Sequence, residues 1–281
     1  MITKEQVLPF IHLAFAEDVR EGDHSSLACI PQEKIGRAHL LVKDQGIIAG
    51  IQLAQWIFEC IDSTLKINKL LADGDLVKKG DIAFIVEGCS VSILTAERLV
   101  LNCMQRMSAI ATKTKEYVAL VEGTNTTILD TRKTTPGIRL LEKWAVRIGG
   151  GANHRFGLYD MIMLKDNHLD YAGGITQAIE KTLSYLKEKN LDLKIEVEAR
   201  DLDEVKEIMK TGGIHRIMLD NFTPSETIVA VQLINKTYET ESSGGITDQT
   251  IRSYAECGVD FISVGALTHS VYNMDLSLKA F

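Results

Sequence analysis

Apolar positions in the first part of the chain alternate between helical and strand-like spacing. Residues 3–20 carry apolar side chains at mostly helical spacing, which predicts an amphipathic helix. Residues 36–88 contain short strand-like runs separated by glycine-aspartate turns such as Asp73-Gly-Asp, with one helix expected near residues 53–61. This mixture predicts a small α/β unit.

A long apolar segment follows. Residues 92–121 contain neither proline nor glycine, which predicts one long helix, with a break near Ala109 as the alternative. Arg98, Asn102 and Gln105 stand at i, i+4 and i+7 and form one polar stripe on this helix. From the residues alone, the stripe reads as a solvated face.

From residue 126 onward, strand-like runs alternate with helical stretches. Glu198, Asp220, Ser243 and Gly265 close four successive runs and are separated by 22, 23 and 22 positions, the length of a compact βα unit. The six clear runs begin at Thr127, Met161, Lys194, Arg216, Tyr238 and Asp260. Repeated βα units predict parallel strands in a barrel or a doubly wound sheet. With six runs, we expect an incomplete, TIM-like barrel.

The expected fold is therefore α/β with two domains. Residues 1–110 form the N-terminal domain, to which residues 270–281 could return, and residues 111–269 form the barrel. The chain carries five widely spaced cysteines, which predicts buried reduced thiols, and it lacks a secretory signal or an apolar run near the roughly 20 residues that span a bilayer. We expect a cytoplasmic protein with no membrane contact.

The net charge of −7 argues against nucleic acid as a partner, so an anionic ligand would need a local cluster of cations. The strand ends supply one, together with two carboxylates and small-residue loops. The residues concerned are Thr131, Arg132, Lys133, His154, Arg155, Lys165, Glu198, Asp220, Ser243, Gly244, Gly245 and Gly265. Each has an ordinary alternative as a surface charge, a helix cap, a structural histidine or a turn. Together, cations at one end of a barrel predict a ligand with several negative charges.

Phosphate is the anion best suited to the last two strands. Ser243-Gly-Gly precedes a helix expected to begin near Thr247, so backbone N–H groups and the helix N-terminus would face a phosphate. The chain has no Walker-type loop, no dinucleotide-binding glycine pattern, no zinc-ligand spacing and no nucleophile elbow. No protein-bound metal is expected.

The motifs together resemble the quinolinate phosphoribosyltransferase family from Glu17-Asp18 to the C-terminus. They are Thr95-Ala-Glu-Arg with Leu101-Asn102, Asp130-Thr-Arg-Lys-Thr-Thr-Pro-Gly, Gly150-Gly-Ala-Asn-His-Arg, Met163-Leu-Lys-Asp-Asn-His, Glu196-Val-Glu, Met218-Leu-Asp-Asn-Phe, Glu241-Ser-Ser-Gly-Gly-Ile and Val264-Gly-Ala-Leu-Thr-His-Ser. Ala109 and His24-Ser25-Ser26 depart from the family pattern, but neither is at a charged position of the site.

The resemblance implies an N-terminal α/β sandwich, an open α/β barrel, and a homodimer in which Arg98 serves the neighbour's barrel, which replaces the solvated-face interpretation. It implies transfer of phosphoribose from phosphoribosyl pyrophosphate to quinolinate with loss of carbon dioxide, giving nicotinate mononucleotide for de novo NAD biosynthesis.

The resemblance also implies roles for the residues at the strand ends. Arg98, Arg132 and Arg155, supported by His154 and Lys165, would bind the dicarboxylate. Lys133, Glu198 and Asp220 would be catalytic, with Mg²⁺ held mainly by the sugar pyrophosphate. Ser243, Gly244, Gly245 and Gly265 would surround the phosphate.

Two alternatives remain open from the sequence. A nicotinate-type phosphoribosyltransferase needs to bind only one carboxylate, so the surplus of cations favours quinolinate. A non-catalytic phosphometabolite-binding protein on the same scaffold would gain little from Glu198 and Asp220 facing an anion.

Overall fold

The computed structural model describes residues 2–281, which form two compact units. The first contains residues up to 115 together with 133–150 and 266–281, and the second contains 116–132 and 151–265. The sequence-based division assigned 111–269 to one barrel domain. It also let residues 270–281 return to the N-terminal domain. In the structure, segments 133–150 and 266–281 group with the first unit.

The first unit is built on a four-stranded antiparallel sheet in the order β12-β1-β5-β3. The C-terminal strand lies at its edge, where Leu40 of β1 pairs with Leu278 of β12. The strands are β1 (Ile35–Val42), β3 (Lys66–Lys69), β5 (Ile82–Cys89) and β12 (Leu276–Ala280), with a separate pair β2 (Gly46–Ile47) and β4 (Leu76–Val77). The helices are α1 (Lys4–Asp18), α2 (His24–Cys29), α3 (Ile51–Ile61), α5 (Arg139–Ile148) and α11 (Ala266–His269).

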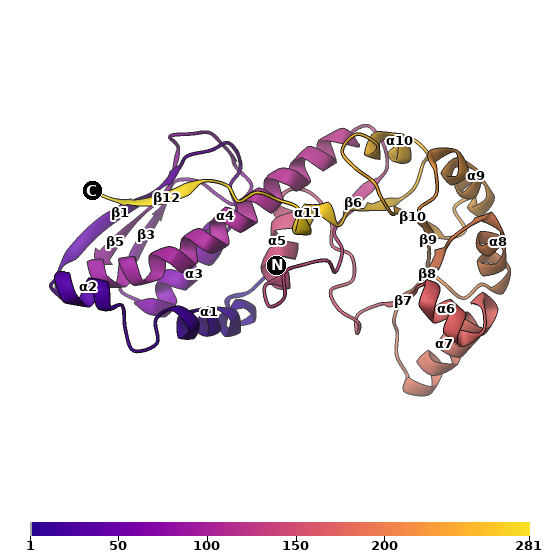
Figure 1. Cartoon of the computed structure of the whole chain (residues 1–281), viewed down its shortest axis with the longest axis horizontal. Helices are drawn as coiled ribbons and strands as arrows, with labels where there is room; N and C mark the ends of the chain where they lie inside the picture. The colour runs from indigo at the N-terminus through magenta and orange to yellow at the C-terminus, as the bar shows by residue number, and fades with distance from the viewer. Residues whose placement is uncertain (1) are drawn as a thin grey trace. The chain divides into compact units, whose positions relative to one another are not determined.

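Packing of helices on one face of this sheet makes the predicted α/β sandwich. Alternate residues of β1 are buried, and α3 buries Ile57 and Phe58. Phe58 meets Phe84 of β5 edge to face, with ring centroids 6.1 Å apart. Figure 1 shows α3 and the long helix α4 (Ser90–Leu120) running along the sheet. The helices predicted near residues 3–20 and 53–61 are confirmed.

Helix α4 (Ser90–Leu120) runs 31 residues without a break, so the alternative of an interruption near Ala109 is wrong. Ala109 is buried in the packed side of the helix. Gln105 does not belong to a solvated stripe, because its Nε2 donates to the carbonyl of Leu276 at 3.1 Å and its own carbonyl accepts from the Met274 N–H at 3.2 Å. This residue holds the C-terminal segment that leads into β12.

The second unit is a six-stranded parallel sheet in the order β6-β11-β10-β9-β8-β7. Its strands are β6 (Thr127–Leu129), β7 (Ile162–Leu164), β8 (Ile195–Ala199), β9 (Arg216–Asp220), β10 (Glu239–Ser243) and β11 (Phe261–Ser263). Its helices are α6 (Asp166–Ala172), α7 (Ile175–Lys189), α8 (Leu202–Thr211), α9 (Pro224–Ile234) and α10 (Ile251–Ala255). Helices α7, α8 and α9 lie along the outer side of the strands (Figure 1).

The two edge strands β6 and β7 do not pair with each other in the described chain, so the barrel is open, as predicted. Strand β8 shows how the interior is filled. All five of its residues are buried, and side chains alternate between faces, so Glu196 and Glu198 share the face opposite Ile195 and Val197. Apolar side chains therefore meet the helices, while acidic ones point into the barrel. No helix within residues 2–281 is long and apolar enough to cross a membrane.

Candidate active site

The ends of β7 and β8 are joined by an ion pair. Lys165 follows β7 directly and is the N-cap residue of α6, and its Nζ lies 3.1 Å from Glu198 Oε2. The Glu198 side chain is 7% exposed whereas that of Lys165 is 47% exposed. The amine is therefore available to a ligand, while the carboxylate beneath it is held in place.

The carboxylates predicted for the site do not cap the helices that follow them. The N-cap of α8 is Asp201 and that of α9 is Thr223, and both side chains accept backbone N–H bonds. This result removes helix capping as the explanation for Glu198 and Asp220. Both remain at the carboxyl ends of neighbouring parallel strands, where active sites of barrels lie.

A buried aspartate shapes the loop that carries the next two cations. Asp130, fully buried after β6, accepts from the His154 N–H at 2.9 Å and from Asn153 Nδ2 at 2.6 Å. The Arg155 N–H donates to His154 Nδ1 at 2.7 Å, and Arg155 Nη1 donates to the carbonyl of Met161 at 3.2 Å. The sequence motif contained Asp130, but only the fold shows that it holds His154, which in turn accepts the Arg155 N–H.

Two arginines of this unit are close enough to affect each other. Burial, followed by the positive charge of Arg132, lowers the pKa of Arg155. The Nε of Arg132 is buried and has no hydrogen-bond acceptor among residues 2–281. A buried guanidinium N–H without an acceptor, beside a second guanidinium, is stabilised by an anion. This pair is the strongest sign of a ligand site.

The loops after β9 and β10 are tightly interlocked. The Asn221 N–H donates to the Ser243 carbonyl at 2.8 Å, and Asn221 Nδ2 donates to Asp220 Oδ2 at 2.6 Å. Gly244 has φ +95°, and a Cβ there would collide with Asn221 Oδ1 and lie 2.9 Å from the Asn221 backbone nitrogen. Glycine is required here because both the backbone conformation and the space exclude a side chain.

The helix expected near Thr247 begins later. Residues 247–250 form a turn in which the Thr250 N–H bonds the Thr247 carbonyl, and the five-residue α10 starts at Ile251. The three threonine and aspartate residues of the turn favour side-chain-capped turns over helix, which explains the difference. Any anion at this loop must therefore be bound by Gly244, Gly245 and their neighbours rather than by a helix N-terminus. Gly265 follows β11 at the start of the next loop.

A second layer of charged side chains lies one alternation deeper, where the predicted His154 meets Glu196 and Glu241, to which sequence reasoning gave no role. His154 Nε2 is 3.1 Å from Glu196 Oε2 and 3.5 Å from Glu241 Oε2, and all three side chains are buried. Arg216 Nη1 donates to Glu241 Oε2 at 2.8 Å. Burial raises the pKa values of Glu196 and Glu241 to about 7 each. The sequence contained a sign of this layer. Glu196 is two residues from Glu198, and Glu241 is two residues from Ser243, so in a strand each would lie on the same face as the predicted site residue.

Arg98 and Lys133, the remaining predicted residues, belong to the first unit. Arg98 is exposed on α4 and makes no hydrogen bond or ion pair within residues 2–281. The Lys133 carbonyl accepts from Thr268 Oγ1 at 2.8 Å. Thr131 lies in the second unit, directly after the Asp130 that holds His154.

A buried ion pair anchors the loop that follows Lys133. Glu142, fully buried in α5, accepts from the Thr135 N–H at 3.0 Å and from Thr135 Oγ1 at 2.9 Å. Arg106 of α4 donates twice to Glu142 Oε1, at 2.9 and 3.0 Å, and also donates to the Thr268 carbonyl. Sequence reasoning missed both residues, since neither differs by pattern from a surface charge.

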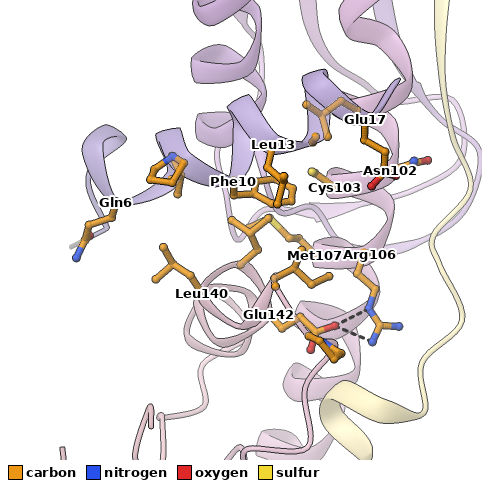
Figure 2. Close-up of a pocket in the computed structure, with 18 residues that line it drawn as sticks. Gln6, Phe10, Leu13, Glu17, Asn102, Cys103, Arg106, Met107, Leu140 and Glu142 are labelled. Carbon is orange, nitrogen blue, oxygen red and sulfur yellow. Dashed lines mark hydrogen bonds and ion pairs between the residues drawn. The ribbon is translucent and has the colours of Figure 1, made fainter. Parts of the chain in front are cut away.

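The same ion pair borders a cavity of about 630 Å³ within the first unit. Figure 2 shows Phe10 and Leu13 of α1 facing Cys103 and Met107 of α4, with the Arg106–Glu142 bond at one side. None of the predicted site residues lines this cavity. Its largely apolar wall does not suit a multiply charged ligand.

The fold and these groups define the class of protein: an α/β sandwich and an open α/β barrel whose strand ends carry a cluster of cations and two carboxylates. Residues 23–108 match the model of the quinolinate phosphoribosyl transferase N-terminal domain, and residues 110–279 match that of its C-terminal domain. The chain belongs to the quinolinate phosphoribosyltransferase family.

Named relatives agree with this assignment over nearly the whole length. The chain is 48% identical to the chloroplastic nicotinate-nucleotide pyrophosphorylase [carboxylating] of Arabidopsis thaliana, over 96% of this chain and 81% of the relative. It is 38% identical to the probable nicotinate-nucleotide pyrophosphorylase [carboxylating] of Bacillus subtilis, over 97% and 93%. The crystal structure of NadC from Streptococcus pyogenes superposes with a TM-score of 0.93 at 36% identity, over 99% of this chain and 97% of that one.

Proposed function

We propose that this chain transfers phosphoribose from phosphoribosyl pyrophosphate to the ring nitrogen of quinolinate and releases pyrophosphate and carbon dioxide. The product is nicotinate mononucleotide, so the enzyme supplies de novo NAD biosynthesis. Membership of the family supports the reaction. The observation that carries it in the structure is the Arg132–Arg155 pair with its unsatisfied buried N–H.

A dicarboxylate satisfies this pair better than a monocarboxylate. Each guanidinium presents several N–H donors that match a carboxylate, and two adjacent carboxylates supply the two negative charges that two arginines require. Lys165 Nζ, exposed at the end of β7, would bind a further carboxylate oxygen, with His154 holding Arg155 in place. Nicotinate carries one carboxylate and would leave one guanidinium unpaired, which disfavours the nicotinate-type alternative.

Glu198 and Asp220 would act on the sugar donor. Their strand ends are adjacent, and negative charge there stabilises the positive charge that develops at C1 as pyrophosphate leaves. Glu198 and Asp220 would also order the water ligands of a Mg²⁺ that is bound by the pyrophosphate and not by the protein. Gly244 and Gly245 would offer backbone N–H groups to the 5-phosphate, with Ser243 and Gly265 beside it, and Lys133 would contribute a cation to the pyrophosphate. These carboxylates have no evident use in a non-catalytic anion-binding protein.

Decarboxylation needs no further cofactor in this scheme. Once the ring nitrogen bonds C1 it is cationic and stabilises the electron pair that the departing 2-carboxylate leaves on C2. C2 then takes up one proton to give nicotinate mononucleotide. The protein's contribution is alignment of the two substrates.

The active assembly in this proposal is a homodimer in which Arg98 binds the dicarboxylate in the partner's barrel. Arg98 is exposed and makes no ion pair with any of residues 2–281, and Leu99 and Asn102 beside it line the cavity shown in Figure 2. A mixture of Arg98→Ala and Lys165→Ala proteins tests the proposal, because exchange of subunits would make heterodimers with one intact site. Failure to regain activity, once mass spectrometry shows exchange, would place Arg98 in its own chain's site or in none.

A cytoplasmic location remains a prediction, which cell fractionation with an antibody to the chain would test. The Arabidopsis relative is named as chloroplastic, which describes that protein.

The reaction itself is tested by incubating the purified protein with quinolinate, phosphoribosyl pyrophosphate and Mg²⁺, and by measuring carbon dioxide and nucleotide together. Nicotinate in place of quinolinate is the matched control substrate. The proposal predicts carbon dioxide from quinolinate and little nucleotide from nicotinate. Equal nucleotide formation from both substrates, or none from quinolinate, would contradict it.

A further inference from the structure

Two buried carboxylates lie beneath the cations of the site. One oxygen each of Glu196 and Glu241 and one ring nitrogen of His154 all lie within 4.8 Å of one another. Both oxygens of Glu196 and Oε1 of Glu241 are buried without a well-aligned hydrogen-bond donor among residues 2–281, and the nearest ring nitrogen, His154 Nε2, lies 3.1 Å from Glu196 Oε2. Arg216 donates to the pair at Glu241 Oε2. Two ionised carboxylates cannot occupy such a place without a large desolvation and repulsion penalty.

A divalent cation does not suit this cluster. Arg216 Nη1 already lies 2.8 Å from Glu241 Oε2 and 3.8 Å from Glu196 Oε2, so a positive charge is present. His154 Nδ1 accepts the Arg155 N–H, which assigns the remaining ring proton of neutral imidazole to Nε2, the atom that faces the carboxylates. A nitrogen that carries a proton cannot ligate a metal. A proton on one of the two carboxyl groups removes one of the two buried negative charges without a metal ion.

The charges that face the pair come from every neighbouring element. Arg155 and Lys165 act on Glu196, and Arg216 of β9 acts on both carboxylates, while His154 and Ser263 of β11 stabilise ionised Glu241. Glu239 is connected to the pair through Arg216. Arg155 and Lys165 are also the groups that the proposed function assigns to the dicarboxylate. A ligand that neutralises them removes stabilisation from ionised Glu196 and adds two negative charges nearby.

We propose that Glu196 and Glu241 form a proton-binding site under the substrate pocket, and that binding of quinolinate is coupled to uptake of a proton by this pair. The inference rests on the proposed function, because it assumes that Arg155 and Lys165 hold the dicarboxylate. Glu196 and Glu241 are positioning residues, since they act on the substrate through His154, Arg155 and the local charge. Burial raises the pKa values of the pair to about 7, so the free protein holds part of the proton at neutral pH.

Calorimetric titration of quinolinate into the protein tests the coupling. The titration is made near pH 7.5 with a chelator present, in buffers with small and large ionisation enthalpies, because the change in apparent enthalpy gives the number of protons taken up. Quinolinate is fully ionised at this pH and contributes none. We expect an uptake between zero and one proton per site that decreases toward pH 6 as the free pair becomes protonated.

Variants distinguish the pair from other groups. Glu241→Gln and Glu196→Gln keep the shape and remove one titrating group each, so uptake should disappear in both while quinolinate still binds. Glu239→Gln is the matched control. Glu239 lies on β10, as Glu241 does, and also pairs with Arg216, but its side chain is 38% exposed. It should retain the uptake.

The outcomes separate the inference from the function. No heat of quinolinate binding by the wild-type protein would contradict the proposed function. Binding whose enthalpy is the same in all buffers would overturn the proton-coupled site alone. Undiminished uptake in both amide variants would also overturn it, since His154 would then hold the proton. If one amide variant fails to fold, the other variant and the wild-type pH series decide the question.

Discussion

Lys165 Nζ bonds Glu198 Oε2 at 3.1 Å and thereby joins the ends of two neighbouring barrel strands, β7 and β8. Lys165 is half exposed and Glu198 is nearly buried, so the buried carboxylate holds the lysine amine in place at the surface. In the proposed function, the cation binds a substrate carboxylate and Glu198 faces the sugar. The two substrates would then be aligned through a single ion pair.

Replacing Lys165 with alanine should weaken quinolinate binding by roughly 10- to 100-fold, the usual value of one hydrogen bond to a charged group. The fold should persist, because Lys165 is half exposed. Steady-state KM and a binding titration measure the effect. Lys194→Ala, which removes an exposed lysine preceding β8, is the control. Unchanged affinity in Lys165→Ala would remove this residue from the site.

Glu198→Gln and Asp220→Asn should lower kcat far more than they raise either KM, because their charge acts mainly on the developing sugar cation. The experiment varies both substrates in turn. Glu226→Gln on the outer helix α9 serves as a control for loss of an acidic group. If kcat stays at the wild-type value in both site variants, these carboxylates take no part in the chemical step.

Gly244→Ala should destabilise the protein by about 1–3 kcal/mol and raise KM for the sugar donor. The added Cβ would strike Asn221, including its backbone nitrogen, at a residue with φ +95°. Gly80→Ala is a matched control, since Gly80 has φ +100° and a Cβ added there would meet nothing within 4 Å. The free energy of unfolding in urea and the KM for the sugar donor are measured for both variants. Gly80→Ala reports the backbone strain alone, and Gly244→Ala reports the strain together with the collision with Asn221. Equal effects of both substitutions would show that the contact with Asn221 is unimportant.

Breaking the Arg106–Glu142 pair should cost about 3–5 kcal/mol in the free energy of unfolding, because Glu142 is fully buried and would lose its charged partner. The variant Arg106→Met tests this loss. Glu142→Gln keeps the shape and should disturb the Lys133 loop more mildly, raising KM for the donor with kcat less affected. Arg252→Met, which breaks an exposed pair with Glu256, is the control. A loss in Arg106→Met no larger than in the control would contradict the anchoring role.

The Glu196–Glu241 pair should also make stability depend on pH. Folding raises the pKa of each group from 4.5 to about 7, so the folded protein binds more protons than the unfolded chain between these values. Their contribution to stability is therefore present below pH 4.5 and is lost as the pH rises to 7. Glu241→Gln should reduce this loss when urea unfolding is compared at pH 5 and pH 8. The same pH dependence in wild-type and variant protein would show that the pair does not titrate in this range.

The barrel could be predicted because each βα unit has the same length and its strands end in polar or glycine residues. The positions of Lys165, Glu198 and Asp220 followed directly, since parallel strands bring their carboxyl ends to one edge. The deeper layer could not be found in the same way. A glutamate inside a strand, such as Glu241, is typical of a solvent-facing position, and only the folded sheet shows that its side chain is buried inside the open barrel.

Other differences arise from contacts distant in sequence. Gln105 read as part of a polar stripe, but its partners lie in the C-terminal segment. Arg106 and Glu142 are 36 residues apart and gain their role only when α5 packs in the first unit. The late start of α10 depends on a local turn at Thr247 and Thr250 that helical spacing alone does not exclude.

Isotope labelling tests the proposed reaction most directly. Quinolinate carrying ¹³C in the 2-carboxylate is incubated with the protein, phosphoribosyl pyrophosphate and Mg²⁺, and carbon NMR follows the label. The proposed function predicts that the label leaves as carbon dioxide and bicarbonate, in equal amount to the unlabelled nicotinate mononucleotide formed. Label retained in a nucleotide product, or label released without nucleotide, would contradict decarboxylating phosphoribosyl transfer by this chain.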